Sequence, residues 1–255
     1  MILHKIREYL RLRLRANKYR GKIDPDDIEF MISSLEPGNT AIDIGCHKGG
    51  YLYWMQKSVS PGGRVIAFEP QEALNRYLQK MVDLFGWKHV EIIPMAVSNY
   101  SGQVNLYAPK DRNTTGATLE AGIFAENDAA FPVESTKLDD FLQKEPYRGL
   151  KINLLKVDVE SHELAVFEGA KETLLRDHPI VMFECEQRVY LNRSITEVFD
   201  FLTNLGYQGF FYYEHQLLRI EEFDLKKHQD TATPGYPNAP GYANNFIFIP
   251  AQGER

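Results

Sequence analysis

The sequence has few of the features that mark secreted, membrane-spanning or nucleic-acid-binding proteins. It has only two cysteines in 255 residues, Cys46 and Cys185, so no disulfide framework is expected and a reducing cytoplasm is predicted. With no further partner at zinc spacing, these two residues also argue against a zinc site or a cysteine nucleophile. No apolar run is long enough to span a bilayer, and the amino terminus lacks the apolar segment of a signal peptide.

Positive charge is also scarce over the chain as a whole. The net charge of −6 predicts no general attraction to nucleic acid, and none is expected as a partner. Residues 1–22 are the exception, because they hold eight basic residues and a single acidic one, Glu8.

The basic segment coincides with a predicted N-terminal arm. Residues 2–20 have the spacing of an amphipathic helix, and a second helix is predicted from Asp24-Pro25 to about Leu35. We therefore expect an arm over residues 1–36 and one domain over residues 37–255. The basic helix is predicted to pack on the domain, to contact the inner face of a membrane, or to form a dimer.

From residue 40 onward, predicted strands alternate with predicted helices. The main strands are expected at 40–44, 64–68, 90–94, 153–159, 180–184, 207–213 and 245–249, with shorter ones at 103–107 and 217–220. The helices are expected at 49–59, 72–85, 138–142, 163–175 and 195–205. This alternation predicts an α/β fold with a doubly wound, mostly parallel, seven-stranded sheet and an antiparallel C-terminal strand.

A glycine turn follows the first predicted strand and indicates a cofactor site. Asp43 ends that strand, and Gly45 and Gly49 then allow close backbone approach to a ligand. An Asp ahead of the glycines would repel the pyrophosphate of NAD. It suits S-adenosylmethionine, which has an ammonium and a sulfonium but no phosphate. The backbone amides of Cys46 and His47 are expected to face this donor.

The next two strand ends support a nucleoside ligand. Glu69 ends the second strand, where a carboxylate accepts hydrogen bonds from ribose hydroxyls. Ala96 and Ser98 follow the third strand, and small residues there allow an adenine ring to lie against the backbone. We predict that Ala96 contacts the donor.

Acidic residues and a histidine follow the fourth predicted strand, beside the expected donor. Lys156, Asp158 and Glu160 alternate along that strand, and His162 begins the next helix. Asp158 is predicted to face the donor's cationic end. Because a hydroxyl acceptor needs a base, we predict that Asp158, Glu160 and His162 are catalytic. Lys156 is expected to form a salt bridge with Glu160 or Glu184.

Two further features of the acceptor side stay open. A divalent metal held by Asp158, Glu160 and Glu184 is conceivable, since oxygen ligands suit magnesium, but no spacing requires it and no metal is predicted. Residues 228–245 form a long Pro- and Gly-rich segment, which is either a plain connection or a lid. In a lid, Tyr236 or Tyr242 would stack on a sugar face.

The motifs together resemble the FkbM-type family of class I S-adenosylmethionine-dependent methyltransferases, over about residues 37–250. Its most specific string, K-I-D-V-E-G-x-E, is similar to residues 156–163, and its D-x-G-A-N-x-G is similar to residues 43–49. Its F-E-P, A-V-S, L-D-D and N-F-x-F-x-P strings match residues 68–70, 96–98, 138–140 and 245–250. Cys46 and His47 replace the usual Ala and Asn, and Ser161 replaces the usual Gly.

The resemblance implies a Rossmann-like fold, S-adenosylmethionine as methyl donor, and methylation of a hydroxyl on a sugar, glycolipid or secondary metabolite. The acceptor itself is not named by any motif. Two alternatives are a binding or scaffold module without catalysis, and a nucleotide-dependent oxidoreductase, which the position of Asp43 argues against.

Overall fold

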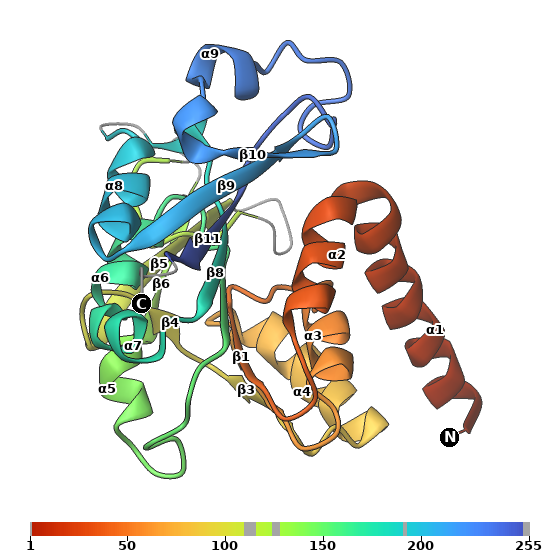
Figure 1. Ribbon diagram of the computed structural model, residues 1–255. Helices are drawn as coiled ribbons and strands as arrows, with labels where there is room; N and C mark the ends of the chain where they lie inside the picture. Colours follow the sequence, from red (N-terminus) through yellow and green to blue (C-terminus); the bar gives the residue numbers. More distant parts are fainter. Residues whose placement is uncertain (1, 110–115, 124–127, 191–192, 252–255) are drawn as a thin grey trace.

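The computed structural model describes residues 2–109, 116–123, 128–190 and 193–251 (Figure 1). Its helices are α1 (Ile2–Lys18), the π-helical turn η1 (Tyr19–Ile23), α2 (Pro25–Ser34), α3 (Leu52–Ser58), α4 (Glu72–Phe85), α5 (Leu138–Leu142), α6 (Glu163–Glu168), α7 (Lys171–Asp177), η2 (Gln187–Val189), α8 (Thr196–Asn204), η3 (Ile220–Glu222) and α9 (Leu225–His228). Its strands are β1 (Thr40–Ile44), β2 (Arg64–Phe68), β3 (Val90–Ile93), β4 (Ala96–Val97), β5 (Gly102–Pro109), β6 (Asp128–Thr136), β7 (Leu154–Val157), β8 (Ile180–Glu184), β9 (Tyr207–Tyr213), β10 (Gln216–Arg219) and β11 (Asn245–Pro250).

The main sheet confirms the predicted doubly wound fold. In the described part of the chain it has eight strands, in the order β10-β9-β11-β8-β7-β1-β2-β3. The run from β8 to β3 is parallel, whereas β11 is antiparallel to both β8 and β9. The eighth strand is β10, which corresponds to the short strand predicted at 217–220 and pairs with β9 at the edge. β1, β2, β8 and β9 have the predicted bounds because their apolar runs end at acidic or turn residues.

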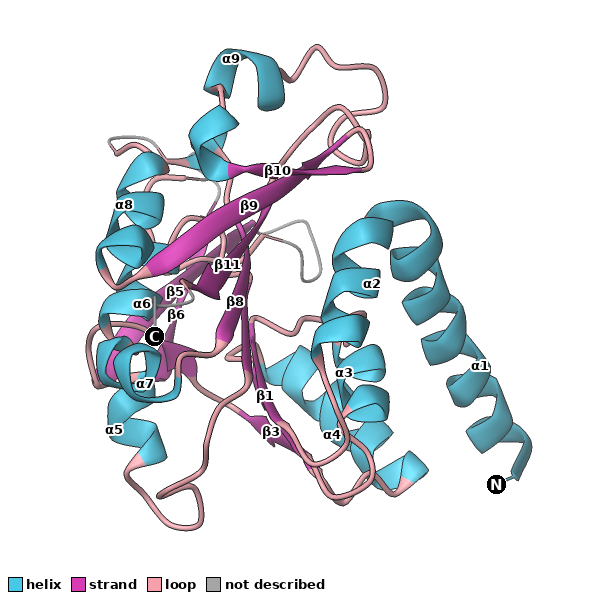
Figure 2. Cartoon of the chain, viewed as in Figure 1, coloured by secondary structure: helices cyan, strands magenta, loops and turns pink. Residues whose placement is uncertain are grey.

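Helices cover both faces of this sheet (Figure 2). On one face, α1 to α4 bury an apolar cluster that includes Met31, Trp54 and Leu78. On the other face, α5 to α8 bury a second cluster that includes Phe167, Phe183 and Phe199. The parallel strands are buried on both sides, which explains why they read as continuous apolar runs.

A smaller sheet was only partly anticipated by the sequence. β5 pairs along its whole length with β6, and β4 pairs with the end of β6. The strand predicted at 103–107 therefore exists, but the polar segment after it returns as β6. The prediction missed β6 because this strand is stabilised by pairing with β5, and the local sequence of β6 does not reveal that pairing.

The fourth parallel strand is shorter than predicted. β7 ends at Val157, so Asp158 and Glu160 lie in the loop after it and not beside Lys156 on one strand edge. Glu160 and Ser161 have positive φ angles of 54° and 74°, a conformation that ends a strand. Ser161 thus occupies a left-handed position, which accounts for glycine being usual there.

The helix predicted at 163–175 is two helices, α6 and α7. They are separated at Gly169-Ala170, where the backbone passes close to the segment after β4. A Cβ atom at Gly169 would lie 2.1 Å from the carbonyl oxygen of Ser98. This close approach requires glycine and interrupts the helix.

The segment 228–245 packs against the domain through part of its length. Tyr242 is buried, and its hydroxyl donates to Glu186 at 2.7 Å. The same side chain lines a cavity between the start of α2 and the segment before β11. Tyr236 is half-buried and makes an edge contact with Tyr242. No helix within the described ranges has the length and apolar character needed to cross a membrane.

Candidate donor and acceptor site

A cavity lies at the carboxyl ends of β1, β2, β7 and β8, where a doubly wound sheet binds its ligands. Its walls come from segments far apart in the sequence. They are formed by Tyr19, Ile44, Gly45, His47, Phe68, Glu69, Pro70, Gln71, Met95, Ala96, Val97, Leu106, Gly116, Ala117, Thr118, Leu119, Asp158, Val159, Glu160, His162 and Glu184.

The glycine turn touches the loop after β7 directly. Gly45 has a φ of +80°, and a Cβ atom there would lie 1.9 Å from the carbonyl oxygen of Asp158. Its amide donates to the carbonyl of Phe68 at 3.0 Å. Gly45 is therefore required both by backbone conformation and by the close approach of the two loops.

Glu69 is held by the backbone on both of its carboxylate oxygens. One oxygen accepts from the amide of His47 at 3.0 Å and the other from the amide of Gln71 at 2.9 Å. Only 3% of Glu69 is exposed, and burial raises its pKa to about 7 despite these two hydrogen bonds. Each oxygen keeps a lone pair for a further donor, as binding of two ribose hydroxyls requires.

Asp43 lies behind the cavity wall, next to a buried lysine. It is directly opposite Lys156 in the register of β1 and β7, and its Oδ2 atom has no hydrogen-bond partner among the described residues. Burial raises the pKa of Asp43 to about 6, although the positive charge of Lys156 opposes this.

Lys156 is a buried cation that lies next to Asp43 and forms a salt bridge with Asp158. Its Nζ atom is 3.3 Å from Asp158 and lies 4.4 Å from the centre of the Tyr51 ring. The expected salt bridge thus exists, but its partner is Asp158 and not Glu160 or Glu184, because the chain turns after Val157. Burial opposes the charge of Lys156, yet the surrounding carboxylates, Asp158 foremost, raise its pKa above the usual value.

The charge of this cavity fits a cationic ligand. Glu69, Asp158, Glu160 and Glu184 line it and Asp43 lies behind it, whereas Lys156 is paired. Such a set would repel a pyrophosphate and attract an ammonium or sulfonium. The residues present therefore fit S-adenosylmethionine as the bound donor.

The N-terminal arm contributes a residue to this cavity. Tyr19 lies in η1 and lines the wall, and its ring packs over Gly50, where a Cβ atom would lie 2.8 Å away. Farther up the arm, Arg15 donates to the carbonyl of Lys48 at 3.2 Å and to the hydroxyl of Tyr77 at 2.9 Å. The arm is thus in contact with the glycine turn.

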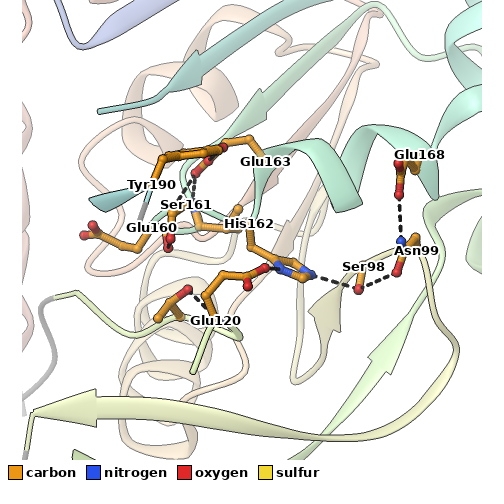
Figure 3. Close-up of polar contacts among 11 residues, drawn as sticks. Ser98, Asn99, Glu120, Glu160, Ser161, His162, Glu163, Glu168 and Tyr190 are labelled. Carbon is orange, nitrogen blue, oxygen red and sulfur yellow. Dashed lines mark hydrogen bonds and ion pairs between the residues drawn. The ribbon is translucent and has the colours of Figure 1, made fainter. Parts of the chain in front are cut away.

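The loop after β7 is fixed by Glu163, the first residue of α6 (Figure 3). This fully buried carboxylate accepts from the amides of Val159 and Ser161 and from the hydroxyl of Tyr190. Glu163 therefore holds the loop in its left-handed conformation, which places Glu160 at the cavity.

Glu160 has the properties expected of a proton acceptor. It lines the cavity, and its carboxylate forms no hydrogen bond with the described residues. Burial and the neighbouring charges of Asp158, Glu163 and Glu186 raise its pKa to about 8. A carboxylate with a pKa this close to neutrality can take a proton from an acceptor with useful driving force.

His162 is engaged on both ring nitrogens (Figure 3). Nδ1 lies 2.6 Å from Glu120 and Nε2 lies 2.9 Å from the hydroxyl of Ser98. The hydrogen bond from His162 lowers the pKa of Glu120. In this arrangement His162 joins the loop after β7 to the β4 end and to the segment around Glu120.

The predicted residues fall into three groups in the structure. Five of the predicted donor residues line the cavity, namely Gly45, His47, Glu69, Ala96 and Asp158. Asp43, Cys46 and Gly49 lie outside the lining. Glu160 and His162 line the same cavity, so the predicted catalytic residues are brought together with the donor residues, although their roles stay predictions.

Some lining residues had no sequence signal. Gly116–Leu119 reach the cavity through a bridge in which Thr118 and Tyr107 exchange backbone hydrogen bonds. Tyr19 belongs to an arm that was predicted as a separate unit. Within the described ranges, no three His, Cys, Asp or Glu side chains are arranged to hold a metal, so Asp158, Glu160 and Glu184 do not form a metal site here.

Comparison with known structures agrees with this fold. A methyltransferase FkbM from Methylobacillus flagellatus KT has 13% identity and a TM-score of 0.50 over 87% of this chain and 50% of its own. This chain therefore spans half the length of that protein. A SAM-dependent methyltransferase from Aquifex aeolicus has 15% identity and a TM-score of 0.50, covering 93% and 94% of the two chains. Cofactor-bound Rv0187 from MTB has 12% identity and a TM-score of 0.51, covering 94% of this chain and 88% of its own.

The family assignment rests on sequence as well. No curated protein matches the chain. A family model for the methyltransferase FkbM domain matches residues 43–208, from the Asp ahead of the glycine turn to β9. The chain therefore belongs to the FkbM family of S-adenosylmethionine-dependent methyltransferases.

Proposed function

We propose that the protein methylates a hydroxyl group on a sugar, glycolipid or secondary metabolite. The observation that carries this proposal is Glu160, a cavity carboxylate without a hydrogen-bond partner among the described residues and with a pKa raised to about 8. An alcohol has a high pKa and needs such a base, whereas an amine needs less assistance.

The chain's residues have separate roles in this proposal. The bound donor supplies an electrophilic methyl group on a sulfonium. Glu69 orients the ribose and Asp158, with Asp43 behind it, faces the cationic end. Glu160 would take the proton of the acceptor hydroxyl as the hydroxyl oxygen bonds to the methyl carbon and the carbon–sulfur bond breaks, leaving S-adenosylhomocysteine. Most of the barrier would be lowered by alignment, which the loop fixed by Glu163 provides.

A neighbouring cavity supports a polyhydroxylated acceptor. It lies between the start of α2 and the segment before β11, and its walls include Asp24, Asp26, Asp27, Asn244 and Asn245. The Nδ2 atom of Asn244 donates to Glu184 at 2.9 Å, so this cavity and the donor cavity share a wall. Carboxylate and carbonyl oxygens suit hydroxyl donors and would repel a phosphate.

The arm is proposed to belong to the function. We propose that residues 1–36 form an arm on a methyltransferase domain of residues 37–255, with Tyr19 closing part of the donor cavity. A cytoplasmic location and the absence of a nucleic-acid partner stay predictions of the sequence.

Donor binding and the type of bond formed can be tested separately. Calorimetry with S-adenosylhomocysteine measures donor binding. To identify the bond, a labelled methyl group is transferred to a panel of sugars, glycolipids and secondary metabolites, and the products are then treated with mild alkali and analysed by mass spectrometry. An ether keeps its label in alkali, a methyl ester releases methanol, and an N-methyl product is recognised by fragmentation.

The outcomes distinguish the alternatives. Alkali-stable O-methyl products support the proposal. Esters or N-methyl products would replace hydroxyl methylation by another acceptor. Binding of S-adenosylhomocysteine with no transfer to any acceptor would favour a binding or scaffold module.

A further inference from the structure

Helix α1 has one face covered by the domain. Leu12 and Ala16 are 2% and 0% exposed, and they pack in the apolar cluster with α3 and α4. The indole nitrogen of Trp54 donates to the carbonyl of Ala16 at 3.0 Å, and Tyr9 makes an edge contact with Phe85. The position of α1 on the domain is therefore fixed by buried contacts.

The other face of α1 carries apolar residues that stay exposed among the residues that the structure describes. Ile6, Leu10 and Leu14 are 50%, 49% and 68% exposed. Their spacing of four residues puts them in a line along the helix, which we call the exposed stripe. Three large aliphatic side chains in line on one exposed helix face indicate a surface that meets an apolar partner.

Positive charge surrounds this stripe. Arg7, Arg11 and Arg13 are exposed on the same helix. Glu8, the single acidic residue in the sequence 1–22, is 8% exposed and lies 2.8 Å from Arg11 and 3.6 Å from Arg7. Residues 1–22 thus hold eight basic residues against one acidic residue in a chain whose net charge is −6.

We propose that α1 is an interfacial helix that docks the enzyme on an anionic phospholipid surface. The exposed stripe enters the boundary between headgroups and acyl chains, and the arginines bind lipid phosphates. Basic residues near an anionic surface add to the attraction, and their long side chains can reach the headgroups from a partly inserted helix. The inference is independent of the acceptor's identity.

Charge argues against a second copy of the chain as the partner. A symmetric dimer through the exposed stripe would place Arg7, Arg11 and Arg13 against the same residues of the partner helix. The repulsion would oppose the burial of the three aliphatic side chains. An anionic lipid surface can bury the three aliphatic side chains and attract the arginines.

Vesicle flotation with the full chain tests this proposal. Vesicles of phosphatidylcholine alone are compared with vesicles that also contain phosphatidylglycerol, at low and high salt. We expect binding to the anionic vesicles only, weakened by salt. The double variant Leu10→Ser, Leu14→Ser should bind at least about tenfold more weakly, because it removes most of the exposed apolar area.

Matched variants separate docking from folding. Leu175→Ser removes a leucine that is 47% exposed on α7, outside the stripe, and should leave vesicle binding unchanged. Arg7→Glu with Arg13→Glu should abolish the preference for anionic vesicles. Calorimetry with S-adenosylhomocysteine shows that each variant is folded.

Three results would overturn the proposal. They are no binding of the wild-type chain to anionic vesicles, equal binding to neutral and anionic vesicles, and equal loss in the Leu175→Ser variant. A concentration-dependent dimer in sedimentation velocity that Leu10→Ser, Leu14→Ser abolishes, without vesicle binding, would assign the stripe to self-association.

Discussion

The donor and acceptor halves of the site are built in opposite ways. On the donor half, both oxygens of Glu69 are held by backbone amides of neighbouring turns. On the acceptor half, the carboxylate of Glu160 has no partner among the described residues and lies in a loop with positive φ angles. In the proposed function, the first arrangement would bind the donor ribose, whereas the second would keep a proton acceptor available.

The two halves meet where Gly45 packs against the carbonyl of Asp158, so breaking this contact should have the largest effect. Gly45→Ala places a Cβ atom against the carbonyl of Asp158 and forces a left-handed alanine. We expect the free energy of unfolding to fall by about 2–5 kcal/mol and donor binding to be lost. Urea unfolding and calorimetry with S-adenosylhomocysteine measure both.

Gly38→Ala is the matched control for this change. Its φ is +93°, but no atom lies within 4 Å of a Cβ there, so only the conformational cost of about 1–2 kcal/mol is expected. Equal effects of the two variants on donor binding would mean that the contact between the halves is unimportant.

The acceptor half alone is tested by Glu160→Gln. We expect kcat to fall by about 10²- to 10⁴-fold with unchanged donor affinity, because only the proton acceptor is removed. Since the pKa of Glu160 is raised to about 8, its ionised form grows as pH rises, and the wild-type rate should increase through pH 8.

The variant should lack that pH-dependent rise. Glu168→Gln, which changes an exposed glutamate on the same helix α6 outside the cavity, should keep the wild-type rate and profile. A normal pH profile in Glu160→Gln would assign the base to another residue.

The donor half alone is tested by Glu69→Gln. One carboxylate oxygen becomes an amide NH2 group, a donor that faces a backbone N–H donor, so we expect S-adenosylhomocysteine to bind about 10- to 100-fold more weakly. Glu72→Gln, three residues on and 81% exposed in its side chain, should bind normally. Normal binding in both variants would remove Glu69 from the donor site.

The smallest effect is expected from His162→Gln. Both nitrogens of His162 are engaged by Glu120 and Ser98, so we expect the residue to act as a connector between segments and not as the base. An amide can keep part of these hydrogen bonds, and kcat should fall by less than about tenfold. A loss above about 100-fold would instead make His162 the base.

The same contrast explains what the sequence could predict. Asp43, Gly45 and Glu69 stand at the ends of consecutive strands, so local pattern and the rules of parallel sheets place them together. The sequence points to Glu160 but places it on a strand, whereas it lies in a loop. The positive φ angles of Glu160 and Ser161 depend on hydrogen bonds to the buried carboxylate of Glu163, which a local pattern does not show.

The walls contributed by Tyr19 and by Thr118 were not foreseen. Thr118 reaches the cavity through pairing with Tyr107, and Tyr19 through burial of α1 against α3 and α4. Both depend on contacts between distant segments, which a periodic pattern in a short window does not contain.

The packing of Tyr19 over Gly50 has a consequence for protein engineering. The ring leaves no space for a side chain at position 50, so the arm and the glycine turn must be exchanged as one unit when chimeras are built. Grafting a different arm onto residues 37–255 would leave this turn uncovered, and a larger residue at position 50 would displace the Tyr19 ring.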